Sequence, residues 1–338
     1  MTSKHIYIAY TGGTIGMQAS QDGFVPAKGF LADTLAALPE FHRPEMPRYT
    51  LFEYPELLDS SEMNPSHWQL IADDIQKHYL DFDGFIILHG TDTMAYTASA
   101  LSFMFENLAK PIIVTGSQIP LAQLRSDGQA NLLNALYIAA NYPIPEVSLF
   151  FNNRLFRGNR ARKVDADGFH AFDSPNYPSL LSAGIKIEAH VEITPMSQTI
   201  EPLEIAIIES QAVGMLTLYP GISSELLANV LQQPVKALIL LSYGIGNAPT
   251  NPALMEQLKF AREREILVVN CTQCLRGKVD MSGYATGKTL ERTGLVSGQD
   301  MTPEAALAKL HYILSLSGLA FTEQQELMSK NLRGEMSA

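Results

Sequence analysis

The sequence contains only two cysteines, Cys271 and Cys274, among its 338 residues. A small secreted domain that is held together by disulfides would carry more. Basic residues are also scarce, because 24 Lys and Arg stand against 35 Asp and Glu and the formal net charge is −11. Nucleic-acid-binding proteins usually have a basic face, and anionic membranes attract basic segments. We therefore expect neither a nucleic acid nor a membrane as a partner.

No apolar run approaches the ~20 residues that a membrane-spanning helix needs. The apolar stretch near the N-terminus ends at Thr11-Gly12-Gly13, which is too early for the core of a signal peptide and is typical of a first strand. Apolar residues make up 46% of the chain and charged residues 17%, a composition that excludes a disordered protein. We expect a folded, cytoplasmic protein.

Several motifs for cofactors and metals are incomplete. The turn at Gly12-Gly13 continues as G-G-x-x-G, whereas dinucleotide binding requires G-x-G-x-x-G. Residues 283–289 have three residues between their glycines, where a phosphate-binding loop has four, and no G-x-S-x-G occurs. Cys271 and Cys274 have redox-type spacing but lie late in the chain, and zinc would need two further ligands. We interpret them as buried, reduced thiols at a strand end, and we expect no metal and no cofactor.

Strands and helices alternate along the first half of the chain, which is typical of an α/β fold with a parallel sheet. Short apolar runs predict strands at Ile6–Tyr10, Phe85–His89, Ile112–Gly116 and Val147–Asn152. Helical periodicity predicts helices at Pro65–Tyr79, Tyr96–Glu106 and Asp127–Ala140. The single tryptophan, Trp68, lies on the apolar face of the first of these, so we expect it in the core.

A polar segment at 188–211 contains two prolines and has no helical period, so it predicts an extended linker between two domains. The expected organisation is an N-terminal α/β catalytic domain at 1–187 and a smaller C-terminal α/β domain at 212–338. In the second part, strands are predicted at Val213–Tyr219, Ala237–Ser242 and Ile266–Asn270. Helices are predicted there at Ser223–Gln232, Pro252–Glu263 and Pro303–Leu316.

Small polar residues follow several of the predicted strands. Because ligands of open α/β sheets bind beyond the carboxyl ends of the strands, Thr14 and Thr91 are candidates for attack on a carbonyl or for binding a substrate. His89 suggests a histidine relay, but a histidine at the end of an apolar strand is more often a hydrogen-bonded structural residue. Lys163 is a basic alternative, although its stretch from Arg157 is more typical of a solvated basic loop.

Polar and glycine-rich motifs recur along the chain at Tyr10–Gly16, Asp59–Met63, Leu88–Ala95, Pro111–Gln118, Leu124–Gly128, Arg157–Arg160 and Tyr243–Pro249. Taken together, these stretches resemble the bacterial asparaginase/glutaminase family, and most closely its cytoplasmic type I L-asparaginases. The resemblance extends over nearly the whole chain, and the occurrence of the first and third of these motifs in this order is highly specific.

The resemblance implies a larger N-terminal parallel-rich α/β domain plus a smaller C-terminal parallel α/β domain. It also implies hydrolysis of L-asparagine to L-aspartate and ammonia without a metal or coenzyme. The expected assembly is a homo-oligomer, an intimate dimer that commonly pairs into a tetramer (a dimer of dimers), with the active sites at the dimer contact.

The resemblance also assigns roles to individual residues. Thr14 matches the nucleophile, Thr91 the second essential threonine, Lys163 the lysine of the triad, and Asp92 its acidic partner. Three neighbouring residues match the segment that binds the α-carboxylate and amine of the substrate: Asp59, Ser60 and Ser61. Two more match positions that complete the site, in part from the neighbouring subunit: Asn247 and Tyr284.

One position departs from the family pattern. Ten residues after the first threonine, type I members usually carry a tyrosine on the N-terminal lid, and this chain has Phe24. The aromatic ring is kept and the hydroxyl is lost. The polar contact of that hydroxyl is then dispensable in this chain, or Tyr284 or water supplies it, or its loss weakens the activity. Phe24 also fits a role that is purely one of packing in a closed lid.

Three alternatives remain beside a type I asparaginase. They are a broader glutaminase-asparaginase, an asparagine-binding or regulatory relative with weakened catalysis, and an amidotransferase subunit. An amidotransferase subunit would usually carry an extra docking domain. Some type I members also have a second, regulatory asparagine site, whose region here would include Arg162, Leu240 and Cys274.

Overall fold

The structure, a computed structural model, describes residues 4–21, 23–191, 201–232, 234–282 and 285–337. The chain forms two units. The first comprises Met1–Ser174 and Pro178–Ala206, and the second comprises Pro175–Tyr177 and Ile207–Ala338. The predicted linker at 188–211 includes two short strands, and residues 192–200 of it lie outside the described residues.

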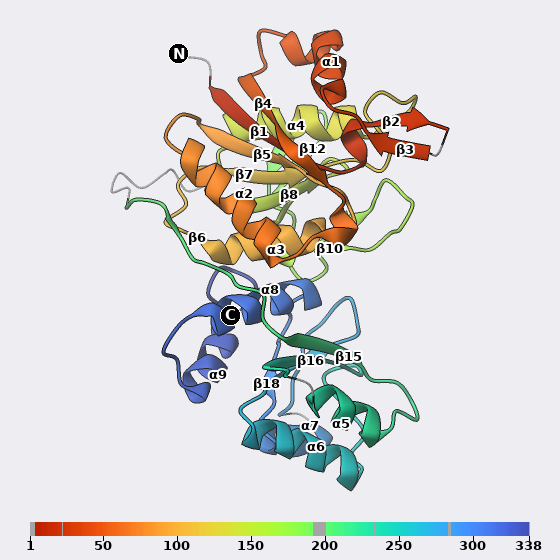
Figure 1. The fold of residues 1–338 in the computed structure, drawn as a ribbon, viewed down its shortest axis with the longest axis vertical. Coiled ribbons are helices and arrows are strands. Elements are labelled where there is room, and N and C mark those ends of the chain that lie inside the picture. Colours follow the sequence, from red (N-terminus) through yellow and green to blue (C-terminus); the bar gives the residue numbers. More distant parts are fainter. Residues whose placement is uncertain (1–3, 22, 192–200, 233, 283–284, 338) are drawn as a thin grey trace. The chain divides into compact units, whose positions relative to one another are not determined.

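The first unit is built around one large sheet, which has eight strands among the described residues (Figure 1). Its order is β13-β12-β9-β8-β7-β5-β1-β4. The pairs from β4 through β1, β5 and β7 to β8 are parallel, and the remaining pairs are antiparallel. The bounds are β1 His5–Gly12, β4 Arg48–Leu58, β5 Gly84–Leu88, β7 Ile112–Thr115, β8 Val147–Phe151, β9 Arg154–Arg157, β12 Leu181–Ala183 and β13 Ile187–Ala189.

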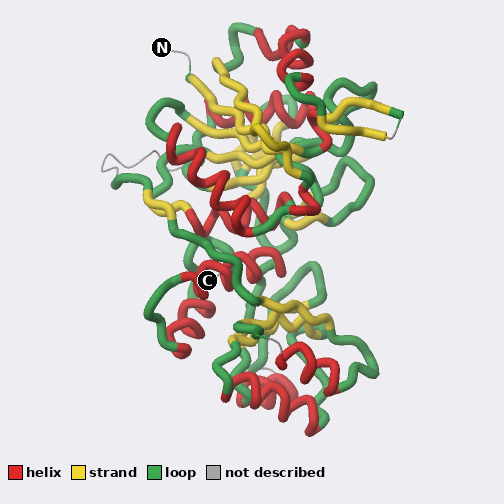
Figure 2. Tube along the Cα trace, viewed as in Figure 1, coloured by secondary structure: helices red, strands yellow, loops and turns green. Residues whose placement is uncertain are grey.

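Helices cover both faces of this sheet, as Figure 2 shows. They are α2 (Pro65–His78), α3 (Met94–Met104) and α4 (Gly128–Asn141), whereas α1 (Phe30–Ala37) contacts β2 (Met17–Ser20). The start of α2 follows the sequence closely, because the Asn64 side chain accepts the backbone N–H of Ser66 and Pro65 occupies the first turn. Trp68 is buried on the inner face of this helix, as predicted.

Among the described residues of the first unit, three small antiparallel pairs lie outside the large sheet. They are β2 (Met17–Ser20) with β3 (Gly23–Pro26), β6 (Phe105–Glu106) with β14 (Glu204–Ile205), and β10 (Arg162–Lys163) with β11 (Phe172–Asp173). The predictions missed these pairs and also α1 and four strands of the large sheet, which are β4, β9, β12 and β13. In β4, polar and apolar residues alternate and Pro55 interrupts the pattern, and both features suit a half-exposed strand at the edge of a sheet.

The second unit contains a parallel sheet in the order β15-β16-β17-β18. The strands are β15 (Val213–Thr217), β16 (Ala237–Ser242), β17 (Leu267–Thr272) and β18 (Val296–Ser297). The helices are α5 (Ser224–Gln232), α6 (Pro252–Glu263), α7 (Ala285–Arg292), α8 (Pro303–Ser315) and α9 (Phe321–Ser329). The predicted fold class is confirmed, and α7, α9 and β18 are additions to the predicted elements.

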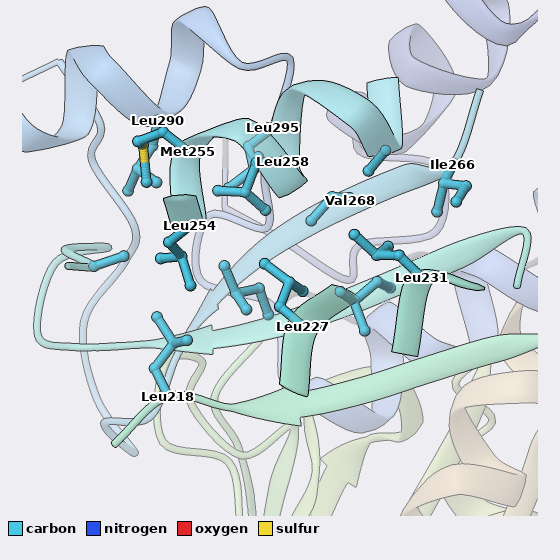
Figure 3. Packing of buried hydrophobic residues seen from close by; sticks show 14 of the residues in the cluster. Leu218, Leu227, Leu231, Leu254, Met255, Leu258, Ile266, Val268, Leu290 and Leu295 are labelled. Carbon is cyan, nitrogen blue, oxygen red and sulfur yellow. The ribbon is translucent and has the colours of Figure 1, made fainter. Parts of the chain in front are cut away.

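The core of the second unit is aliphatic. Leucines of α5 and α6 lie against residues of the sheet, and Figure 3 shows this packing. The labelled members are Leu218, Leu227, Leu231, Leu254, Met255, Leu258, Ile266, Val268, Leu290 and Leu295. Leu240 of β16 belongs to the same buried cluster.

Candidate active site

The end of β1 makes a close approach to the loop that follows β5. Gly12 and Gly13 have φ values of 137° and 91°, a region that favours glycine. A Cβ atom on Gly13 would lie 2.4 Å from the backbone nitrogen of Gly90, so a side chain does not fit there. Thr14 and Thr91 each come directly after one of these two touching glycines. The backbone therefore brings the two predicted threonines to one place at the carboxyl ends of β1 and β5.

The side chain of Thr91 lies between a lysine and an amide. The Lys163 amine donates to Thr91 Oγ1 at 3.0 Å, and the Thr91 hydroxyl donates to Gln118 Oε1 at 3.0 Å. The same amine donates to Asp92 Oδ1 at 2.7 Å. Thr91 is buried, whereas the Asp92 side chain is 65% exposed. Three of the four predicted catalytic residues are thus joined by direct hydrogen bonds.

Lys163 does not lie in a solvated basic loop, so that interpretation of the stretch Arg157–Lys163 is wrong. Arg160 is 2% exposed, and the backbone turns inward at Gly158, where a Cβ would lie 2.9 Å from the carbonyl oxygen of Val147. Lys163 itself pairs with Phe172 across β10 and β11, and its side chain is 21% exposed. Because the turn at Gly158–Arg160 is buried, Lys163 lies close to Thr91.

Sequence reasoning did not single out Gln118, which follows β7. Its amide nitrogen donates to the carbonyl oxygens of Ala166 and Gly168 at 3.3 and 3.2 Å, while its oxygen accepts from Thr91. Both partners of its amide nitrogen belong to the segment after Lys163. Gln118 therefore links that segment to Thr91. Two signals were available in the sequence: its place three residues after a buried strand, and its position at the end of the matching stretch Pro111–Gln118.

The segment Asp59–Ser61 lies beside the same loop. The carboxylate of Asp59 accepts the backbone N–H and the hydroxyl of Ser61, both at 2.9 Å. Ser60 is buried, and its carbonyl oxygen accepts the hydroxyl of Thr93 at 2.6 Å. A Cβ on Gly90 would lie 2.4 Å from Ser60 Oγ, so this serine packs against the glycine that precedes Thr91.

His89 is a structural residue, as the commoner interpretation predicted. It is buried, its Nδ1 lies 2.7 Å from the carbonyl oxygen of Gly90, and its Nε2 lies 2.9 Å from Thr97 Oγ1. Because a carbonyl only accepts, Nδ1 carries the proton and Nε2 accepts from Thr97. Burial lowers the pKa of His89 to about 4, although its bond to Gly90 works in the opposite direction.

The remaining predicted residues are distributed over both units. Phe24 lies on β3 opposite Ala19 of β2 and is 49% exposed. Arg162 precedes Lys163 on β10 of the first unit, and the second unit holds Asn247, Leu240 and Cys274. Tyr284 lies outside the described residues.

The prediction for the cysteines was partly wrong. Cys271 is buried within β17, but Cys274 lies beyond the end of that strand and is exposed. Both are free thiols. The described residues contain no group of three or more His, Cys, Asp or Glu side chains that could hold a metal ion. In the same part of the chain, no helix is long and apolar enough to cross a membrane.

The chain is similar to known proteins in both sequence and structure. Residues 5–195 match the family model "Asparaginase, N-terminal", and residues 212–328 match "Glutaminase/Asparaginase C-terminal domain". The chain is 61% identical over 337 residues to L-asparaginase 1 of Escherichia coli, with 100% of this chain and 99% of that protein covered.

Two solved structures are similar over almost the full length. The crystal structure of L-asparaginase I from Vibrio cholerae has a TM-score of 0.93 at 61% identity, with both chains fully covered. The thermostable L-asparaginase from Thermococcus kodakarensis has a TM-score of 0.87 at 29% identity, with 99% of each chain covered.

Proposed function

Because the chain belongs to the asparaginase family, we propose that it is an L-asparaginase that hydrolyses L-asparagine to L-aspartate and ammonia. The observation that carries this proposal is the hydrogen-bonded group of Thr91, Asp92 and Lys163 beside the turn that bears Thr14. A hydroxyl nucleophile needs a group that takes its proton, and an amide carbonyl under attack needs donors for its developing charge.

In the proposed reaction, the Thr14 hydroxyl attacks the side-chain amide carbon of asparagine. The proton of the Thr14 hydroxyl passes to the amide nitrogen, the C–N bond breaks, ammonia leaves, and a β-aspartyl ester remains on Thr14. Water hydrolyses this ester, which releases aspartate and restores the hydroxyl. Thr91, Asp92 and Lys163 form the proposed proton-transfer group, in which the carboxylate of Asp92 orients the Lys163 amine.

The substrate is a zwitterion at its α-carbon, so its binding site needs both a carboxylate and donors. We assign the α-amine and α-carboxylate of asparagine to Asp59, Ser60 and Ser61. The hydroxyl of Ser61 already lies 2.9 Å from Asp59, so this segment holds a carboxylate and a hydroxyl side by side. Asn247 and Tyr284 are assigned to completing the site, and Arg162, Leu240 and Cys274 to a regulatory asparagine site. The proposed assembly is a cytoplasmic dimer of dimers.

Ammonia release with asparagine and with glutamine, measured over a concentration series, tests the proposal. Thr14→Ala should lower kcat by at least a hundredfold, because the atom that forms the ester is gone. Thr50→Ala is the matched control, since Thr50 lies on β4 next to His5, far along the strand from the carboxyl end. Equal release from both substrates would favour a glutaminase-asparaginase. No release from either substrate would contradict the assignment, and aspartate binding without turnover would indicate a regulatory relative.

The assembly is tested separately by light scattering coupled to gel filtration. A mass close to four times 37.2 kDa supports the dimer of dimers. A monomer at micromolar concentration would contradict it.

A further inference from the structure

The hairpin of β2 and β3 follows Thr14 almost directly along the chain. It begins at Met17, three residues after the threonine, and leads through Gly29 into α1. Most described residues of both strands are exposed, including Phe24. With little buried surface of its own, the hairpin depends on contacts at its two ends for its position.

The first end of the hairpin rests on Tyr10 of β1. Tyr10 is fully buried, and a Cβ on Gly16 would lie 2.2 Å from its hydroxyl oxygen and 2.4 Å from Cζ. No L side chain fits at Gly16 while the phenol ring stays in place. The ring therefore restricts the position of the backbone at Gly16, two residues after Thr14.

The second end of the hairpin is held by Glu53 of β4. Both carboxylate oxygens of Glu53 accept the backbone N–H of Gly29, at 3.1 and 3.0 Å. Gly29 has a φ of 76° and precedes the first turn of α1 without a side-chain cap of its own. A carboxylate at this place also interacts favourably with the N-terminal end of the helix.

These two contacts come from neighbouring side chains on one face of the sheet. Tyr10 and Glu53 are partners in the parallel register of β1 and β4, so their side chains point the same way. The pKa of Tyr10 is raised by burial and further by the charge of Glu53. Within the described residues the Tyr10 hydroxyl has no hydrogen-bond partner. A phenol that bonds to nothing there acts on Gly16 through contact alone.

We propose that Tyr10 and Glu53 are positioning residues for this reaction, which together hold the two ends of the hairpin and so set the position of Thr14. The proposal rests on the proposed function, with Thr14 as the nucleophile. Neither residue has to touch the substrate. Their effect arises because a misplacement of about 1 Å in a reacting group can cost a hundredfold in rate.

Glu53 is tested by Glu53→Ala against Glu56→Ala, a matched control on the same strand whose side chain is exposed. Loss of a hydrogen bond to a charged group corresponds to roughly tenfold or more in rate. We expect kcat for asparagine to fall about tenfold in Glu53→Ala, with a smaller change in KM, and no change in Glu56→Ala. Glu53→Gln should recover most of the loss, because its amide oxygen still accepts the N–H of Gly29.

A second readout does not depend on activity. Lys28 is exposed and precedes Gly29, and it is the only Lys or Arg between residues 5 and 42. If Glu53 holds Gly29, the rate of tryptic cleavage after Lys28 should rise at least fivefold in Glu53→Ala and stay unchanged in Glu56→Ala. Mass spectrometry of the 29–338 product identifies the cut.

Tyr10 is tested by a double-mutant cycle with Gly16. Gly16→Ala should lower kcat strongly, because its methyl group meets the phenol. In a Tyr10→Leu background, which lacks Cζ and the hydroxyl, the same change should cost at least tenfold less in kcat. Circular dichroism establishes that each variant is folded.

The proposal is overturned if Glu53→Ala keeps both the kcat and the cleavage rate of wild type, or if the Gly16 and Tyr10 changes are additive. It is also overturned if kcat falls while cleavage after Lys28 does not change, because Glu53 then acts otherwise than on Gly29. Failure of the asparaginase assignment can be distinguished from failure of this proposal, because wild type itself would then release no ammonia. The cleavage rates still decide in that case whether Glu53 holds the hairpin.

Discussion

His89 makes the stability of the first unit depend on pH, and this dependence follows from its burial. The neutral ring donates from Nδ1 to the carbonyl of Gly90 and accepts at Nε2 from Thr97, which is itself buried. Protonation would place a charge in this site and turn Nε2 into a donor. The pKa of His89 is therefore lowered to about 4, from the 6.5 of an unperturbed histidine.

Proton linkage gives the sign and the size of the change in stability with pH that His89 causes. Below about pH 6.5 the unfolded chain takes up a proton at this residue, while the folded chain does not until about pH 4. Stability from this group is thus fully present above about pH 7.5 and is lost as the pH falls toward 4. The loss is about 2 kcal/mol at pH 5 and about 3 kcal/mol below pH 4.

Urea unfolding at pH 7.5 and pH 5, followed by tryptophan fluorescence, measures this loss. The only tryptophan, Trp68, is buried in the same unit as His89, so it reports the unfolding of that unit. His89→Asn keeps a donor for the Gly90 carbonyl but does not titrate. We expect this variant to have a lower free energy of unfolding than wild type at pH 7.5. Its free energy of unfolding should also fall less between pH 7.5 and pH 5 than that of wild type, by about 2 kcal/mol.

The control for this experiment is His190→Asn, because His190 is exposed. In this control variant, the free energy of unfolding should change between pH 7.5 and pH 5 by the same amount as in wild type. If His89→Asn shows the same pH dependence as wild type, the buried neutral ring is not its source and the reasoning is refuted.

Three further predictions follow from the same structure. Lys163→Met should lower kcat at least a hundredfold while aspartate binding by calorimetry changes little; a normal kcat with a raised KM would instead make Lys163 a binding residue. Glu335→Leu should lower the free energy of unfolding by about 3–5 kcal/mol, because the fully buried ammonium of Lys309 loses the carboxylate that lies 2.6 Å away. The double variant Lys309→Met/Glu335→Leu should lose less free energy of unfolding in urea titrations than Glu335→Leu alone. An equal or larger loss in the double variant would contradict this account. Phe24→Ala should lower kcat whereas Phe24→Tyr should keep or modestly raise it; wild-type kinetics in Phe24→Ala would show that this ring has no part in closing the site.

Elements whose pattern is local were predicted well from the sequence. The strands β1, β5, β7 and β8 are apolar runs that are buried on both faces, and α2 carries its own cap at Asn64. Apolar runs and caps act over a few residues, so they are visible without knowledge of the fold. The edge strand β4 and the β2–β3 hairpin are exposed and mixed in character, so their sequences carry no comparable signal.

The candidate site shows the same division. Local patterns of residues revealed that threonines follow glycines at the ends of two buried strands, and the order of the motifs identified the family. The folded chain was needed to show that the Lys163 amine reaches Thr91 across 72 residues, that Gln118 accepts from Thr91, and that Tyr10 lies beside Glu53. Contacts of this kind depend on strand order, on register and on the burial of the turn before Lys163. These properties arise from the packing of distant segments, and no local pattern of residues encodes them.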